Sequence, residues 1–508
     1  MSNWSDGYIN SIGYTHGYFS GLNPQSVIIP FLTAGIKPPK IVTACELGFG
    51  QGVSFAVHSI ATDAQWHGTD FNPTHAHNAK NLLEQSGMDS SFACDQSFAE
   101  FCQRDDLPDF DFIAFHGIWS WISDENRHII VDFLRRKLKV GGVVYISYNT
   151  LPGWAANSPI RHLLSEYNKI TFANTSPANL SSLLDKSEEL LSLSYRLQEE
   201  TPNMKDKIIS LKDKNPVYLA HEYLNSHWQP MYFAEVEKWL ADAKLTYAAS
   251  SDFLDDFQSC LFDDEQQQFM AQIDNPSFAQ TAKDYLLNVQ FRRDLWVKGG
   301  LPLSREAVFD EWSKLNVRYI HDVNQFEYKA SRRRSVELNK EVFTPVLTLL
   351  ADNKTHNVGE LYKQLDNKVS QRDLIVALSI LNAKDDLILV QDEQVVQAKA
   401  AYCHKFNLQM LESAKSSSSG SIHLISPLAG SAFMLTRIDA LFLLAHKQGH
   451  KKDKWAKFAW QILDNAGQRM IKNGEELLTA EDNLAHLAEL TDNFLNDSFK
   501  TLQALEIV

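Results

Sequence analysis

The sequence has few cysteines and a deficit of basic residues, and each shortage excludes a class of protein. The five cysteines are odd in number and no two are separated by two residues, so neither a disulfide framework nor a paired-cysteine metal site is expected. Lysine and arginine total 48 against 63 acidic residues, a formal net charge of −15, which argues against nucleic acid as the main partner. We expect a reduced, cytoplasmic protein without a bound metal.

Long apolar segments are also missing. No run approaches the roughly 18 apolar residues of a membrane span. The first residues lack the basic start and apolar core of a signal peptide. We therefore expect neither feature. The length of 508 residues exceeds one compact core, so two to four domains are expected.

The first part of the chain, from residue 41 to residue 148, alternates strand-like and helix-like segments. Apolar, β-prone runs are separated by amphipathic helical patterns, an order typical of an open, mostly parallel sheet with helices on both faces. The expected strands are 41–45, 66–70, 110–115 and 143–148, and the expected helices are 53–60, 78–86 and 124–139.

Beyond residue 150 the pattern becomes mainly helical. The segment "SRRRS" (331–335) is interpreted as a solvated linker. The stretch "DDLILVQDEQVVQAK" (385–399) contains two β-prone runs around a polar turn, which favours a winged-helix-like module. Because residues 335–399 carry ten acids against seven bases, we expect this module to contact protein or to dimerise rather than to bind DNA.

A glycine-rich turn, "ELGFGQG" (46–52), follows the first expected strand. The dinucleotide fingerprint G-x-G-x-x-G would need a third glycine at Val53, but the glycine is one residue early, at Gly52. The pattern is instead an acid, Glu46, followed by glycines at alternate positions. Glycines allow a sharp turn and the close approach of a ligand, although a purely structural turn would use the same residues.

Acids follow the next two expected strands. Asp70 ends the second strand, 24 residues after Glu46, at a place where an acid can accept hydrogen bonds from both hydroxyls of a ribose. Asp95 lies in "CDQSFAEF" (94–101), between the expected strands at 66–70 and 110–115. It would follow a further strand, the third of the sheet in chain order. For each of them the alternative is an N-cap of the helix that follows. His116 and "HGIWSWIS" (116–123) follow the fourth strand.

These elements in this order resemble the class I S-adenosylmethionine (SAM)-dependent methyltransferases, with residues 46–52 as motif I. The chain is similar to bacterial members with a methyltransferase regulatory domain, among them the rickettsial protein-lysine methyltransferases that modify outer-membrane proteins. The stretches that carry the resemblance are "GYTHGYFSGLNPQSV" (13–27), "TDFNPTHAHNAKNL" (69–82), "HGIWSWIS" (116–123), "VGGVVYISYNTLPGW" (140–154), "YLAHEYLNSHWQPMYFAEV" (218–236) and "AKDYLLNVQFRRDLW" (282–296).

The resemblance implies a fold and a division of the chain. The fold is α/β, with a Rossmann-like methyltransferase domain followed by mainly helical regulatory and winged-helix-like domains. The implied domains are a SAM-binding domain with an N-terminal lid at 1–160, a helical and regulatory region at 161–330, a winged-helix-like module at 335–410 and a helical region at 422–508.

The resemblance also assigns the cofactor site. Glu46 would help neutralise the α-ammonium group of SAM, Asp70 would bind the ribose and Asp95 would contact the adenine amino group. The implied cofactor-binding residues are Glu46, Gly48, Gly50, Asp70, Asp95, His116, Tyr14 and Tyr18.

Several roles stay open at this point. His116 could contact SAM, act as a general base, or simply cap its strand. Trp119 and Trp121 could form an aromatic wall beside the sulfonium and the substrate, although we expect one of them in the core. Tyr14 and Tyr18 would share one face of a helical lid, or serve as ordinary docking aromatics.

The expected reaction is an in-line methyl transfer to a protein side chain, with lysine first and the residues after 300 as a substrate platform. The exit loop after strand four lacks the Asn/Asp-Pro-Pro-aromatic motif common in amino-group methyltransferases, which leaves the acceptor atom open. Alternatives are a small-molecule or saccharide methyltransferase and a non-catalytic SAM-binding regulator. A homodimer is a further expectation. His75 and His77 alternate on a helix and point apart, so no metal is assigned.

Overall fold

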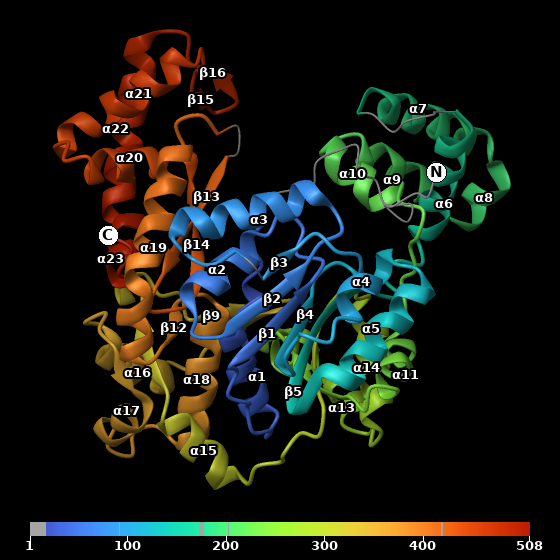
Figure 1. Ribbon diagram of the computed structural model, residues 1–508, viewed down its shortest axis with the longest axis horizontal. Helices are drawn as coiled ribbons and strands as arrows, with labels where there is room; N and C mark the ends of the chain where they lie inside the picture. The colour runs from blue at the N-terminus through green and yellow to red at the C-terminus, as the bar shows by residue number, and fades with distance from the viewer. Residues whose placement is uncertain (1–16, 91, 172–176, 202, 418–419) are drawn as a thin grey trace.

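The computed structural model describes residues 17–508 except 91, 172–176, 202 and 418–419. Its centre is a seven-stranded sheet in the order β3-β2-β1-β4-β5-β7-β6 (Figure 1). The strands are β1 (Thr43–Leu47), β2 (Gln65–Thr69), β3 (Ala93–Cys94), β4 (Phe110–Phe115), β5 (Leu138–Asn149), β6 (Thr246–Ser250) and β7 (Phe291–Val297). The first five are parallel, and β7 runs antiparallel to β5 and β6.

The sheet confirms the expected α/β fold and adds two strands from distant sequence. Because β6 and β7 come from residues 246–297, the region after 160 completes the same sheet that the first 150 residues begin. The strand expected at 143–148 begins earlier in the structure, at Leu138. Gly141 and Gly142 therefore lie within β5.

Helices cover both faces of the sheet. One face carries α1 (Ile28–Thr33), α2 (Val53–Ala61) and α3 (Pro73–Ser86), whose apolar side chains pack with Phe112, Tyr145 and Leu295. The other carries α4 (Phe98–Cys102), α5 (Asp124–Lys137) and α11 (Phe233–Ala241), packed around Phe110, Ile113 and Trp296. The helices that connect β6 to β7 are η4 (Phe253–Asp255), α12 (Gln258–Leu261), α13 (Asp264–Met270) and α14 (Pro276–Leu287).

A lobe of helices lies between β5 and β6 in sequence and projects at the upper right of Figure 1. It has its own apolar core, with Leu164, Leu183 and Ile208 buried in it. Its helices are α6 (Ser158–Thr171), α7 (Pro177–Leu193), α8 (Tyr195–Glu200), α9 (Met204–Leu211) and α10 (Pro216–Tyr223).

A three-stranded sheet, β11-β8-β12, packs with helices in the region where a winged-helix-like module is predicted. The second β-prone run of "DDLILVQDEQVVQAK" is not a strand, because Val395 and Val396 lie in the first turns of a 21-residue helix, α19. The central strand of this sheet, β8, comes instead from residues 316–319. The elements are α15 (Arg305–Ser313), β8 (Asn316–Tyr319), η5 (Val323–Gln325), α16 (Lys340–Leu350), β11 (His356–Asn357), α17 (Val358–Gln364), α18 (Gln371–Ala383), β12 (Leu387–Val390) and α19 (Glu393–Ser413).

The linker expected at 331–335 is instead the turn of a hairpin between β9 (Lys329–Ser331) and β10 (Ser335–Glu337). The Arg332 guanidinium pairs with Asp255, with Nε 2.5 Å from Oδ1, and Arg334 donates to the Phe262 carbonyl at 2.7 Å. The prediction of a solvated linker is wrong because two of the three arginines bind acceptors in the segment between β6 and β7.

The last region combines two hairpins with helices and packs on α19. Its elements are β13 (Ser421–Ser426), β14 (Ser431–Thr436), α20 (Arg437–Lys447), η6 (Lys452–Lys454), α21 (Trp455–Asn465), β15 (Ile471–Lys472), β16 (Glu475–Glu476), α22 (Ala480–Asn496) and α23 (Ser498–Ala504). Across the described residues, no helix is both long and apolar enough to cross a bilayer.

Candidate functional site

The glycine turn connects β1 to α2 at the carboxyl edge of the sheet. Gly48, Gly50 and Gly52 all have positive φ, at 70°, 57° and 72°, a region in which a Cβ is costly. A Cβ at Gly48 would lie 2.5 Å from Cδ1 of Ile118, and one at Gly52 would lie 2.4 Å from Cβ of Ala79. Gly52 therefore allows α3 to pack, whereas Gly48 keeps the turn clear of the loop that follows β4.

Glu46 is the buried carboxyl group of this turn, with 3% of its surface exposed. Its Oε2 atom has no hydrogen-bond partner among the described residues. Burial, and secondarily the charge of Asp70, raises the pKa of Glu46 to about 8. A buried acceptor without a donor is costly, so this atom fits a cationic ligand group rather than a structural role.

Asp70 follows β2 and is held by three donors. Its Oδ2 accepts from Gly50 N at 2.8 Å, and its Oδ1 accepts from Asn72 N at 2.9 Å and lies 3.1 Å from Nδ1 of His75. The N-cap alternative does not apply, because Asn72 caps α3. Asp70 thus ties the glycine turn to α3, and His75 is a contact that sequence reasoning missed.

Asp95 directly follows β3 and its side chain is exposed. The N-cap alternative does not apply here either, because Ser97 caps α4 and forms a capping box with Glu100. The Asp95 carboxylate therefore lies at the same edge of the sheet, where an incoming ligand can reach it.

His116 ends β4 and is held on three sides. Its Nδ1 lies 2.9 Å from Oη of Tyr145 and 3.2 Å from Oγ of Ser147, while the Phe19 ring stacks on the imidazole with centroids 3.9 Å apart. Burial, together with the charge of Arg293, lowers the pKa of His116 to about 3. The imidazole is therefore neutral at physiological pH and a weak base there.

The two tryptophans after β4 separate. Trp119 is fully buried, with its ring 5.9 Å from that of Trp239 in the core. Trp121 is half-buried and lies 5.9 Å from the Arg161 guanidinium. The expectation that one tryptophan belongs to the core is confirmed for Trp119, which leaves Trp121 as the one near the edge.

The N-terminal segment covers His116, but not through the predicted tyrosines. Tyr14 lies outside the described residues. Tyr18 precedes the first short helix, η1 (Ser20–Leu22), and bonds to Nε2 of His58 at 3.2 Å, so it faces α2 instead of sitting on a helical lid. Phe19 makes the covering contact, and the pattern of tyrosines gave no signal for it.

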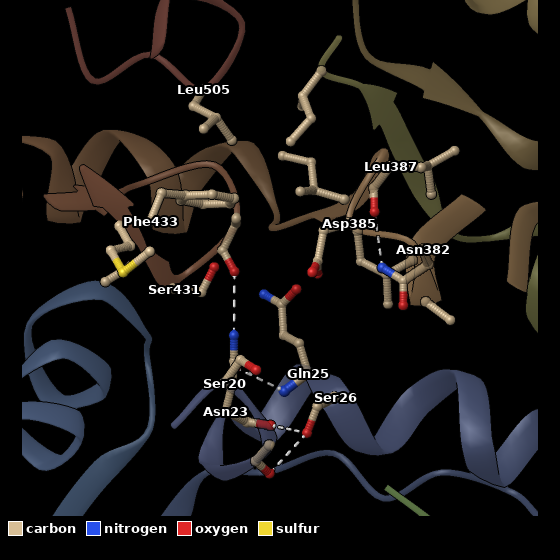
Figure 2. Close-up of a pocket in the computed structure, with 18 of the residues that line it drawn as sticks. Ser20, Asn23, Gln25, Ser26, Asn382, Asp385, Leu387, Ser431, Phe433 and Leu505 are labelled. Carbon is tan, nitrogen blue, oxygen red and sulfur yellow. Dashed lines mark hydrogen bonds between the residues drawn. The ribbon is translucent and has the colours of Figure 1, made fainter. Parts of the chain in front are cut away.

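A cavity of about 720 Å³ adjoins this segment on the side of Tyr18 and Gly21. It is bounded by η2 (Pro24–Val27), the β6–η4 connection, the α18–β12 turn, the β13–β14 hairpin and α23. Figure 2 shows Gln25 projecting into the space with Asp385 opposite. Its charged lining is mainly acidic, with Asp252, Asp385 and Asp497 against Arg293.

The structure thus brings most of the predicted site residues that it describes to one edge of the sheet, apart from Trp119 and Tyr18, whereas Tyr14 lies outside the described residues. This edge joins an unpartnered carboxyl, a close-approach glycine turn and two further acids, a set suited to a cationic nucleoside ligand. No group of three or more metal-ligating side chains occurs in the part of the chain that the structure describes.

Known proteins resemble this chain in sequence and in fold. A family model described as a predicted methyltransferase regulatory domain matches residues 215–298. The uncharacterized protein sll1526 of Synechocystis is 34% identical over 513 residues, which cover 99% of each chain. The uncharacterized protein RP789 of Rickettsia prowazekii is 25% identical over 304 residues, 58% of this chain and 53% of that one.

The fold is shared with PKMT2 from Rickettsia typhi, solved in complex with AdoHcy, the demethylated product of SAM. The superposition covers 96% of this chain and 99% of PKMT2, with a TM-score of 0.67 and 15% sequence identity. A second structure of PKMT2 from Rickettsia typhi gives the same TM-score.

Proposed function

The chain belongs to the family of Synechocystis protein sll1526, and on that premise we propose that it is a SAM-dependent methyltransferase. The observation that carries the proposal is Oε2 of Glu46, a buried acceptor without a donor, beside a turn whose glycines admit a ligand. SAM carries an α-ammonium group that would complete this atom's hydrogen bonding. The AdoHcy complex of PKMT2, which shares the fold, supports the same assignment.

Three acids and the glycine turn would hold the cofactor along the edge. Glu46 would bind the ammonium group, the Gly48–Gly50 backbone would pass close to the methionine part, Asp70 would accept from the ribose hydroxyls and Asp95 from the adenine amino group. Asp70 already accepts from three donors, and a carboxylate offers about four acceptor positions. The His75 contact is therefore the one that we expect to loosen when the ribose binds.

SAM supplies an activated methyl group on a sulfonium. What the chain must contribute is alignment, with the acceptor atom about 3–3.5 Å from the methyl carbon and water kept out. Phe19 and His116 close the β4 side of the site, and the neutral imidazole adds no charge that would repel the sulfonium. We assign His116 a positioning role and not that of a general base.

The proposed acceptor is a protein side chain, with lysine as the first choice. The large cavity supports this choice, because residues beyond 300 supply much of its lining and it adjoins the segment that covers His116. A small metabolite would not require such a recess. The carboxylates of Asp252, Asp385 and Asp497 line the cavity and suit a cationic segment of a substrate chain.

The test is to incubate the purified protein with methyl-labelled SAM and lysate of its host, and to separate macromolecules from small molecules. Label in a protein band that is lost with Asp70→Ala is the predicted result. Label confined to the small-molecule fraction would favour a metabolite or saccharide acceptor. Binding of SAM without any transfer would contradict the enzyme and favour a regulator.

We also propose that the chain forms a homodimer through the helical lobe. Large apolar side chains are exposed there, and a concentration of this kind marks an interaction surface. They include Ile170 (80% exposed), Leu193 (66%) and Tyr195 (70%). Light scattering on the purified chain should give twice the 57.7 kDa monomer mass, and a monomer at micromolar concentration would contradict this assembly.

The cytoplasmic location stays a prediction.

A further inference from the structure

A further carboxyl group, that of the half-buried Glu222, lies at the same edge of the sheet. It belongs to α10, within the segment that matches the regulatory-domain model. Its Oε1 accepts a hydrogen bond from Nδ2 of Asn149, the last residue of β5, at 3.3 Å. The lobe thus delivers one acid to the end of the central strand next to β4.

The position of Asn149 relates this acid to His116. Alternate residues of a strand share a face, so Tyr145, Ser147 and Asn149 point the same way. Tyr145 and Ser147 are the partners of His116, and Asn149 lies two residues further, about 7 Å along the strand. Its backbone N donates to Oγ of Ser120 in the loop after β4 at 2.9 Å. Glu222 therefore stands just beyond the place where β4 and β5 end.

Among the residues that the structure describes, no cationic side chain forms an ion pair with the Glu222 carboxylate. Arg161 approaches α10, but its Nε donates to the backbone carbonyl of Glu222 at 3.4 Å and its Nη2 to that of Asn225 at 2.6 Å. In the described part of the chain, the Asn149 amide is the one hydrogen-bond donor to the carboxylate. Burial raises the pKa of Glu222 to about 7, against the opposing effects of Asn149 and Arg161.

Aromatic rings pack around Arg161, next to α10. The Arg161 guanidinium lies 4.5 Å from the centre of the Trp228 ring and 5.9 Å from that of Trp121. Trp154 packs against Trp228, with ring centroids 5.3 Å apart. The buried Nε1 of Trp228 finds no acceptor among the described residues. Ring faces favour cations, and these rings lie near the helix that carries Glu222.

We propose that the Glu222 carboxylate binds the amino group of the acceptor and takes its proton before methyl transfer, with Asn149 holding the carboxylate in place. This inference rests on the proposed methyltransferase function. A nitrogen–hydrogen bond of the ammonium breaks, the proton joins a carboxylate oxygen, and the electron pair stays on nitrogen. That pair then attacks the methyl carbon, and the carbon–sulfur bonding pair leaves with the sulfur.

The inference accounts for two features at once. The chain lacks the motif that commonly orients an acceptor nitrogen after β4, and a carboxyl–amide pair at the end of β5 would take its place. It also gives the matched domain a catalytic part, because residues 215–298 supply β6, β7 and Glu222.

The experiment compares wild type with Glu222→Gln and with Glu222→Asp, using methyl-labelled SAM and host-lysate protein as the probe. We expect Glu222→Gln to lower the rate of label transfer at pH 7 by roughly 100-fold, the low end of what a positioned acid–base group contributes. SAM affinity should change less than twofold. Glu222→Asp, which keeps the carboxylate, should retain more activity than Glu222→Gln, and this difference separates chemistry from misfolding.

The pH profile gives a second readout. Charged or titratable groups that face Glu222 are Arg161 from α6, and Tyr218 and Tyr223 from its own helix. The wild-type rate should rise as Glu222 ionises near pH 7, and Glu222→Gln should recover part of its activity near pH 9–10, where free amines become available (roughly the lysine pKa). The matched control is Glu166→Gln on α6, an exposed acid paired with Lys169, which should behave as wild type.

The outcomes are distinguishable. Equal transfer rates for wild type and Glu222→Gln would overturn this inference and leave the proposed function intact. A wild-type protein that binds SAM but labels no protein at any pH would overturn the proposed function, and this inference with it.

Discussion

The two halves of the sheet edge are built differently. In the half formed by β1, β2 and β3, the candidate binding residues come from residues 46–95. The backbone holds them in place, since the N–H groups of Gly50 and Asn72 both donate to the Asp70 carboxylate. In the half formed by β4 and β5, the groups come from residue 19, the loop after 116, Asn149 and α10. The first half is preorganised by its own strands, whereas the second depends on how distant segments dock.

In the proposed function, this difference separates cofactor binding from acceptor binding. Substitutions in the first half should act on SAM affinity and those in the second on transfer to the acceptor.

Gly48→Ala should have the largest effect. A Cβ there meets Ile118 at 2.5 Å, and the positive φ costs a further 1–2 kcal/mol or so. We expect SAM affinity to fall by roughly 100-fold, since two such costs together amount to about 3 kcal/mol. Isothermal titration measures the loss. Gly420→Ala, where a Cβ meets nothing within 4 Å, is the control and should bind normally.

Asp70→Asn should come next. It removes the charge that accepts from Gly50 and faces the ribose, and it should weaken SAM binding by roughly 1–3 kcal/mol. Asp132→Asn, at a surface acid paired with Arg135 and Arg136, is the control. An unchanged affinity for Asp70→Asn would mean that the ribose lies elsewhere.

Glu46 should make SAM binding depend on pH. Because its pKa is raised to about 8 in the free protein, the carboxyl is protonated below pH 8 and must lose that proton to bind an ammonium. Affinity should therefore rise with pH toward about 8 and fall again at higher pH, where the α-ammonium group of SAM loses its own proton (an α-amino group has a pKa of roughly 7.7–8.0). Glu46→Gln should bind roughly tenfold more weakly at pH 8 and lose the rise below that pH, since a hydrogen bond to a charged group contributes about 1.5–3 kcal/mol. A rise that persists in the variant would assign the titration to another group.

Asp385→Asn should have the smallest effect. The residue is exposed at the cavity with φ near 59°, a conformation that asparagine tolerates. Loss of one exposed charge should raise KM for a protein substrate about two- to fivefold, within the 0.2–1 kcal/mol or so of a surface ion pair. SAM affinity should stay constant, and a change in it would connect the cavity to the cofactor.

The two halves also differ in what the sequence predicts. Glu46 and Gly48 lie at the end of β1 and Asp70 directly follows β2, so strand order and spacing place them at one edge. Asp95 directly follows β3 and lies there for the same reason. The contacts of Phe19 with His116 and of Asn149 with Glu222 form only through tertiary packing across more than 70 residues, and no local pattern indicates which side chain of a helix faces the edge.

Two errors have local causes. Arg332 reads as part of a solvated linker because nothing near it in sequence shows that Asp255 will accept its hydrogen bonds. The run at 395–396 reads as a strand because valine favours strands, whereas the alanines at 398, 400 and 401 and the packing of α19 favour a helix.

The most direct test of the central claim is a crystal structure with S-adenosylhomocysteine. The account predicts the ligand's amino nitrogen within about 3 Å of Oε2 of Glu46, its ribose at Asp70 and its adenine beside Asp95. A ligand bound in the 720 Å³ cavity, or bound at the edge with Oε2 of Glu46 still unpartnered, would contradict it.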